Sequence, residues 1–267
     1  MRNLLNALML YSRIPVPAPK EFCKEDTNRA MRHFVFVGWV VGLICGIVYI
    51  FLMPVFGIAT GVILALASGI LATGAFHEDG FADTLDGFGG GRRDRQRILD
   101  IMKDSHIGTY GVMGLIVLFA LKAAALYALL SSKPFLSNHA AIITFVLYHS
   151  LARYSSGLVA VSSRYARTDG SGKLTPAENG WSWREAAGIV FWTIPPIVAA
   201  ACWFKTSVYW FVMLPVVMML PVLCCRRFFN KRLGGYTGDC LGFVEQISEV
   251  FLLLYLLFVT HFGFSIC

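Results

Sequence analysis

Acidic side chains gather in one short part of the sequence, between residues 78 and 104. This segment holds seven of the 16 Asp and Glu residues, and Asp79, Asp83 and Asp86 are spaced four and three residues apart. On a helix this spacing places three carboxylates along one stripe, where they repel one another unless a cation lies between them. Carboxylate oxygens are typical ligands of Mg²⁺ or Mn²⁺. The pattern predicts a divalent-metal site; the alternative is a solvated acidic face paired with the arginines of segment 92–97.

A second polar set lies between residues 234 and 249, where a glycine-rich turn leads into an apolar stretch. Thr237 or Asp239 can cap the helix that begins there. A glycine-rich turn at a helix N-terminus is also an anion site. Four residues, spaced four, three and four apart, share one face of that helix: Gly238, Gly242, Glu245 and Glu249. The alternative is a capped, tightly packed helix whose two glutamates face water at the membrane interface.

Two further side chains could meet a phosphate. Arg153 lies inside an apolar stretch, and a buried arginine needs an acidic or phosphate partner. His106 precedes a glycine-containing segment at 108–114. We expect His106 either to donate a hydrogen bond to a phosphate or to lie among lipid headgroups.

The composition shows what kind of scaffold must hold these residues. Hydrophobic residues make up 57% of the 267 and charged residues only 15%, whereas a soluble domain is usually about one-quarter charged. This excludes disorder, a disulfide-rich secreted module and an ordinary cytosolic enzyme. The seven cysteines contain no Cys-x-x-Cys pair, so we expect reduced thiols. Basic cytoplasmic loops explain the net charge of +7, and nucleic acid is not expected as a partner.

Apolar stretches long enough to cross a bilayer recur along the whole chain. They lie at roughly 34–52, 58–76, 110–130, 138–162, 186–204, 207–224 and 241–264. The first two are separated only by a tight turn at 53–57. We therefore predict an all-α fold: a polytopic integral membrane helical bundle of about seven transmembrane helices, forming one membrane-embedded catalytic domain over residues 1–267.

The basic residues fall unevenly on the two sides of these predicted spans. When loops alternate sides, one side receives 19 of the 23 Lys and Arg residues and the other receives 2, while Lys122 and Arg153 fall inside spans. The 19 lie in segments 2–32, 92–103, 164–184 and 226–232. Cytoplasmic loops carry the excess of Lys and Arg. We therefore predict a cytoplasmic N-terminus and an active site that faces the cytoplasm.

These features together indicate phosphoryl-group transfer at a membrane face. Metal ions held by carboxylates would stabilise the charge on a transferred phosphoryl group. Another carboxylate could take the proton from an attacking hydroxyl. The residues by themselves do not identify the substrate.

Four blocks of the sequence match one known family, in order and at the right distances. They are Tyr11–Pro17, His77–Gly87, Lys103–Gly111, and Gly235–Asp239 followed by Glu245. Over nearly its whole length the chain resembles the cobalamin synthases, the adenosylcobinamide-GDP ribazoletransferases. It departs from them at His106, where arginine is common, which puts the role of that residue in doubt.

The resemblance implies an Mg²⁺-dependent phosphotransferase of cobalamin biosynthesis, working at the nucleotide-loop assembly step in the cell inner membrane. It would join α-ribazole or its 5′-phosphate to adenosylcobinamide-GDP, release GMP and form adenosylcobalamin or its 5′-phosphate. The implied metal ligands are Asp79, Asp83, Asp86 and Asp104, and the implied catalytic residues are Asp83, Asp239 and Glu245. The implied substrate and phosphate contacts are Arg13, Arg153, His106, Gly235, Thr237 and Gly238. Membrane lipid is an expected partner, and a homo-oligomer is left open.

Two other functions compete with this interpretation. A CDP-alcohol phosphotransferase acting on lipids also aligns carboxylates on membrane helices, but it carries an Asp-Gly-x-x-Ala-Arg run, and here Asp83 follows Ala82. An ion-coupled transporter would need an acidic site within the membrane. Against a transporter, the acids gather at one membrane face, and we expect the midplane to be nearly free of charge.

Overall fold

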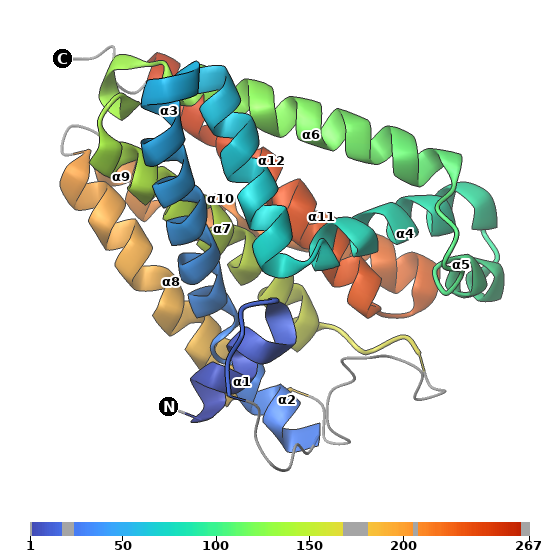
Figure 1. Cartoon of the computed structure of the whole chain (residues 1–267). Helices are drawn as coiled ribbons and strands as arrows, with labels where there is room; N and C mark the ends of the chain where they lie inside the picture. The colour runs from blue at the N-terminus through green and yellow to red at the C-terminus, as the bar shows by residue number, and fades with distance from the viewer. Residues whose placement is uncertain (1, 18–23, 168–180, 205–207, 263–267) are drawn as a thin grey trace.

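The computed structural model describes residues 2–17, 24–167, 181–204 and 208–262, which form helices joined by short connections (Figure 1). The α-helices are α1 (Arg2–Tyr11), α2 (Lys24–Met31), α3 (Phe34–Thr73), α4 (Phe76–Gly91), α5 (Arg95–Ile101), α6 (Thr109–Leu130), α7 (Asn138–Ser162), α8 (Trp183–Trp203), α9 (Val208–Val212), α10 (Leu214–Val217), α11 (Met219–Leu233) and α12 (Gly238–Phe262). A short 3₁₀ helix, η1 (Lys133–Phe135), links α6 to α7. These residues contain no β-strand, so the predicted all-α class is confirmed.

Four of the described helices, α3, α6, α8 and α12, are long and apolar enough to cross a membrane. Large apolar side chains on all four are exposed, for example Phe51, Ile116, Phe191 and Phe258. Exposed apolar surface of this extent is typical of contact with lipid. The structure therefore supports membrane embedding, while the count of seven spans and the cytoplasmic N-terminus stay predictions.

Helix α3 is a hairpin of two antiparallel arms. Its 40 residues include one with non-helical backbone angles, Gly57, at φ +80° and ψ 168°. A side chain at position 69 would begin 3.0 Å from the Cys45 sulfur, whereas a straight helix would separate these positions by about 36 Å. The predicted pair of spans at 34–52 and 58–76 thus exists, and glycine provides the positive φ at which the chain reverses.

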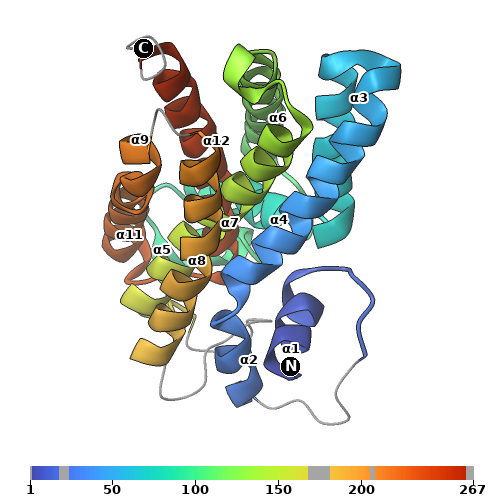
Figure 2. The same cartoon turned by 90° about the vertical axis from the view of Figure 1, so that its left-hand side faces the viewer.

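Of the other predicted spans, one forms a single continuous helix and another is broken into short helices. The predicted span at 138–162 is α7, which lies at the centre of the bundle against α3, α8 and α12 (Figure 2). The described part of the predicted span at 207–224 is broken into α9, α10 and the start of α11. Pro215 and Pro221 lie in the first turns of α10 and α11, where a missing N–H removes no helical hydrogen bond.

Helix α4 leads from the hairpin towards α5 and packs against α12 and α6. Its first turns run beside the start of α12 because neither helix carries a side chain at the crossing. A Cβ on Gly80 would lie 2.9 Å from the Asp239 carbonyl oxygen, and one on Gly242 would lie 2.8 Å from that of His77. This close approach brings the two acidic segments of the sequence together.

Candidate active site

An acidic cavity of about 420 Å³ lies where α4, the α5–α6 connection and the start of α12 meet. Four of the lining residues carry carboxylates: Asp79, Asp83, Asp104 and Asp239. The two acidic segments of the sequence, 77–109 and 234–249, therefore share one cavity. Two basic side chains, Lys103 and Arg167, complete the charged lining among the described residues.

Asp83 lies among the other negative charges of this cavity. Burial, followed by the negative charges of Asp79 and Asp239, raises its pKa to about 7. Burial disfavours the charged carboxylate, and the neighbouring carboxylates add to this effect. In the part of the chain that the structure describes, no three acidic, histidine or cysteine side chains converge closely enough to enclose a metal. The donor set fits a divalent cation in its chemistry, although it is not a closed coordination shell.

Asp104 lies at the outer edge of the cavity, where it pairs with His106. The His106 Nδ1 lies 2.6 Å from the Asp104 Oδ1, and the same oxygen accepts the His106 backbone N–H. These hydrogen bonds lower the pKa of Asp104, so its carboxylate is ionised at neutral pH. His106 itself is exposed, and its nearest polar contact is therefore this aspartate.

Asp86, the third member of the predicted stripe, has a different environment. Its carboxylate oxygens accept the backbone N–H groups of Gly108 at 2.7 Å and Gly111 at 2.9 Å. These are N–H groups at the start of α6, which have no partner within their own helix. Asp86 is buried and does not line the cavity, so its contacts anchor α6 to α4.

The turn before α12 fixes the far side of the cavity. Tyr236 exchanges backbone hydrogen bonds with the segment after α7: its N–H donates to the Arg164 carbonyl at 2.9 Å, and its own carbonyl accepts the Ala166 N–H at 2.8 Å. Thr237 is buried, and its hydroxyl accepts the Cys240 N–H, so it caps α12. Gly235 packs against the Arg164 carbonyl with no room for a side chain. Of the three predicted contacts here, only Gly238 lines the cavity.

Asp239 forms an ion pair that the sequence did not predict. The Arg167 Nη2 donates to the Asp239 Oδ2 at 2.8 Å. In the sequence, Arg167 is one of the basic residues of segment 164–184. No local pattern marks it, because its position depends on the long-range pairing with Tyr236.

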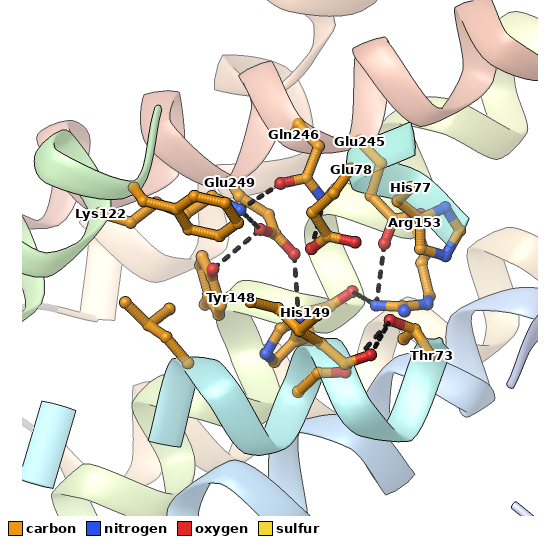
Figure 3. A pocket seen from close by; sticks show the side chains of 14 residues that line it. Thr73, His77, Glu78, Lys122, Tyr148, His149, Arg153, Glu245, Gln246 and Glu249 are labelled. Atoms are coloured by element: carbon orange, nitrogen blue, oxygen red, sulfur yellow. Dashed lines mark hydrogen bonds and ion pairs between the residues drawn. The ribbon is translucent and has the colours of Figure 1, made fainter. Parts of the chain in front are cut away.

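A second cluster of charged residues lies inside the bundle, between α4, α6, α7 and α12 (Figure 3). The Arg153 Nη1 lies 3.1 Å from the Glu245 Oε1, and the His77 Nδ1 lies 3.2 Å from the other Glu245 oxygen. Both predicted site residues, Arg153 and Glu245, are 1% exposed. No residue lines both this cluster and the acidic cavity, so Arg153 and Glu245 do not face the carboxylates of the cavity.

The deeper half of this cluster centres on Glu249. Its carboxylate pairs with Lys122, accepts the Tyr148 hydroxyl at 2.8 Å and lies 3.0 Å from the His149 Nδ1. The expectation of a nearly charge-free midplane is therefore wrong, because Lys122 and Glu249 lie near the middle of α6 and α12. The free space among these residues is about 10 Å³, room for one water molecule. A lysine in the middle of an apolar stretch was the signal that could have revealed this cluster.

The predicted phosphate contact Arg13 lies at the turn between α3 and α4. Its backbone N–H donates to the Ala72 carbonyl at 2.7 Å, and its side chain covers Gly74. Arg13 is not among the residues that line either cavity. Its contacts connect the N-terminal segment to the end of α3.

Comparison with known proteins gives a consistent set of matches. A model of the family described as cobalamin-5-phosphate synthase matches residues 3–257. A protein of Shewanella amazonensis named adenosylcobinamide-GDP ribazoletransferase is 36% identical over 95% of this chain and 94% of its own. Proteins of the same name from Vibrio parahaemolyticus and Ralstonia pickettii are 32% and 35% identical, over 98% and 94% of this chain and 93% of each relative. None of the solved structures matches the chain.

Proposed function

The chain belongs to the cobalamin-5-phosphate synthase family, and we propose that it is an adenosylcobinamide-GDP ribazoletransferase that works with Mg²⁺. The enzyme transfers the adenosylcobinamide-phosphate group of adenosylcobinamide-GDP to a hydroxyl of α-ribazole or α-ribazole 5′-phosphate. GMP leaves, and adenosylcobalamin or its 5′-phosphate forms. The observation that carries this proposal is the cavity in which four carboxylates face one arginine and one lysine beside membrane helices.

Asp79 and Asp83 of α4, with Asp104 from the facing α5–α6 connection, are the residues that would hold Mg²⁺. Their shared cavity, in which four carboxylates outnumber the two cations Lys103 and Arg167, fits a divalent-cation site. When bound, the metal neutralises negative charge on the diphosphate and on the departing phosphate. We assign Asp86 to support of this site, because its oxygens are engaged by the start of α6.

The remaining residues position the substrates and the carboxylates. The Asp239 carboxylate lines the cavity with one oxygen on Arg167, so it can accept the proton of the attacking hydroxyl. Glu245, which the resemblance implied as a ligand or base, is engaged by Arg153 and His77. We therefore propose that Glu245 of α12 holds α4 in place through His77, which lies two residues before Asp79.

The location follows from the same elements. The acidic cavity and the basic segments 92–103 and 164–167 lie in the part of the molecule that the charge distribution assigns to the cytoplasm. We propose an inner-membrane enzyme whose cavity opens to the cytoplasm.

A direct assay tests the proposal. Purified protein in detergent is supplied with adenosylcobinamide-GDP, α-ribazole and Mg²⁺, and GMP and the corrinoid product are measured by chromatography. We expect equal amounts of both, loss of both after chelation with EDTA, and recovery on adding Mg²⁺. A CDP-alcohol phosphotransferase would instead release CMP from a CDP-alcohol and an acceptor alcohol. A transporter would release neither nucleotide.

A further inference from the structure

Arg167 has hydrogen-bonding capacity that its known partner does not use. Its side chain is 10% exposed and donates through Nη2 to Asp239. Its Nε is buried and has no hydrogen-bond partner among the residues that the structure describes. A guanidinium carries five N–H donors in a rigid fork, and leaving a buried donor without an acceptor is costly. A ligand oxygen would remove this cost, because Arg167 lines the acidic cavity.

The residue before Arg167, Ala166, is hydrogen-bonded through both of its backbone groups. Ala166 donates its N–H to Tyr236, and the Ala166 carbonyl accepts the Arg95 Nη2 at 2.7 Å. The same Arg95 donates through Nε to the Leu233 carbonyl at 2.8 Å. Arg95 of α5 therefore links Ala166, the residue before Arg167, to Leu233 at the end of α11. Its guanidinium reaches the cavity from a fixed position, as a binding residue must.

The charge of the cavity makes this position important for an anionic substrate. Its carboxylates repel a diphosphate, and Arg167 is one of two cationic side chains among the described lining residues. Arginine is suited to such a contact because its planar fork can donate two parallel hydrogen bonds to phosphate oxygens. A lysine offers only a point charge.

We propose that Arg167 is a substrate-binding residue that contacts the diphosphate of adenosylcobinamide-GDP through the donors that Asp239 leaves free. This inference rests on the proposed function and adds to it the residue that recognises the anionic part of the nucleotide substrate. The competing role is that of a counter-ion, in which Arg167 serves only to hold Asp239 ionised. The two roles differ in whether removal of Arg167 weakens substrate binding.

Equilibrium dialysis in the presence of Mg²⁺ separates these roles, with bound corrinoid measured by its visible absorbance. The ligands are adenosylcobinamide-GDP and adenosylcobinamide, which lacks phosphate. The variants are Arg167→Gln, Arg167→Lys and the matched control Arg164→Gln, whose side chain is exposed on the same segment. We expect Arg167→Gln to weaken adenosylcobinamide-GDP binding about ten- to hundredfold, the range for a charge-assisted hydrogen bond, and to leave adenosylcobinamide binding unchanged. Arg164→Gln should bind both ligands as the wild type does.

Arg167→Lys keeps the positive charge but removes the guanidinium, so it tests whether hydrogen bonds from the guanidinium are needed for substrate binding. It also gives this answer if Arg167→Gln does not fold. It should bind adenosylcobinamide-GDP several-fold more weakly than the wild type, with KM raised more than kcat is lowered. Wild-type binding by Arg167→Lys, or lower kcat with unchanged binding in Arg167→Gln, would overturn the inference. Absence of GMP release by the wild-type enzyme would instead overturn the proposed function, so the two failures are distinguishable.

Discussion

Two aspartates three residues apart on α4, Asp83 and Asp86, have different surroundings. Asp83 faces other carboxylates across the cavity, whereas both oxygens of Asp86 accept backbone N–H groups at the start of α6. The spacing in the sequence predicted the stripe that contains them. It could not show which member faces the cavity, because that depends on the position of Gly108, the residue before α6, which lies 22 residues after Asp86.

Replacing Asp83 should impair catalysis without unfolding the protein. Asp83→Asn keeps the size and polarity of the side chain but removes its charge. We expect turnover to fall far more than tenfold, where each factor of ten corresponds to about 1.36 kcal/mol of barrier, and the Mg²⁺ requirement to rise. The measurement is GMP release as a function of Mg²⁺ concentration.

Asp94→Asn is the matched control for this experiment. Asp94 caps α5 by accepting the N–H groups of Gln96 and Arg97, and asparagine caps a helix about as well as aspartate. Its turnover and Mg²⁺ dependence should equal those of the wild type. Wild-type kinetics in Asp83→Asn would mean that the stripe is an ordinary acidic face.

Replacing Asp86 should reduce the stability of the protein and leave its Mg²⁺ requirement unchanged, unlike the replacement of Asp83. Asp86→Ala leaves two N–H groups of α6 without their acceptor, and we expect the free energy of unfolding to fall by about 1–3 kcal/mol. The Mg²⁺ concentration for half-maximal activity of the folded fraction should not change. Thermal unfolding in detergent and the Mg²⁺ titration measure the two effects. An unchanged unfolding temperature with a raised Mg²⁺ requirement would identify Asp86 as a ligand after all.

Between elements, the contact that matters most for the cavity is the crossing of α4 and α12. Gly80 approaches the Asp239 backbone so closely that an added Cβ would lie 2.9 Å from its carbonyl oxygen. Gly80→Ala should therefore push α4 away from α12 by a few tenths of an ångström. A shift of this kind between catalytic groups can cost a large part of the rate.

We expect Gly80→Ala to lower turnover about tenfold or more and to reduce stability by about 1–3 kcal/mol, as overpacking does. Gly90→Ala on the same helix is the control, because its Cβ would meet only the end of the Ile101 side chain. Steady-state kinetics and thermal unfolding compare the two variants. Equal turnover in both would show that the crossing does not set the cavity geometry.

The buried cluster around Glu249 joins α6, α7 and α12. Glu249→Gln would leave Lys122 buried without its negative partner, and breaking a buried ion pair in this way costs about 3–5 kcal/mol. We expect a correspondingly lower unfolding temperature in detergent. The double variant Lys122→Met with Glu249→Gln should recover part of the loss. A single variant as stable as the wild type would show that Lys122 has another counter-charge.

The sequence predicted most of the helices but not how the polar residues pair. The α3 hairpin, α6, α7, α8 and α12 each follow from an apolar stretch and its boundaries. Lys122 and Arg153 were visible as charges within spans. Their partners could not be identified, because Glu249 and Glu245 lie on a helix that meets them only after the bundle has packed.

As a whole, the molecule has two ends that we expect to differ in their content of basic residues. The turn of α3 and the C-terminal ends of α6 and α12 lie at one end of the bundle, and α1 and α2 lie at the other (Figure 2). The charge distribution assigns the end with α1 and α2 to the cytoplasm, since one set of loops holds 19 basic residues and the other 2.

Cysteine labelling tests this orientation. In a variant without the native cysteines, Ser131→Cys places a thiol after α6, and Ser105→Cys places one at the acidic cavity. A membrane-impermeant maleimide should label the Ser131 variant in intact cells and the Ser105 variant only after lysis. The reverse pattern would invert the topology and move the cavity to the outer face.

The ion pair between Lys122 and Glu249 also constrains how the chain is made. The two residues are 127 positions apart, so α6 leaves the ribosome long before its counter-charge exists. A lysine at the centre of an isolated membrane helix costs about 2.5–3.5 kcal/mol on insertion scales. The other apolar residues of α6 can offset this cost, but Lys122 has to wait for its counter-charge until α12 is made, and a chain cut short before α12 lacks that partner.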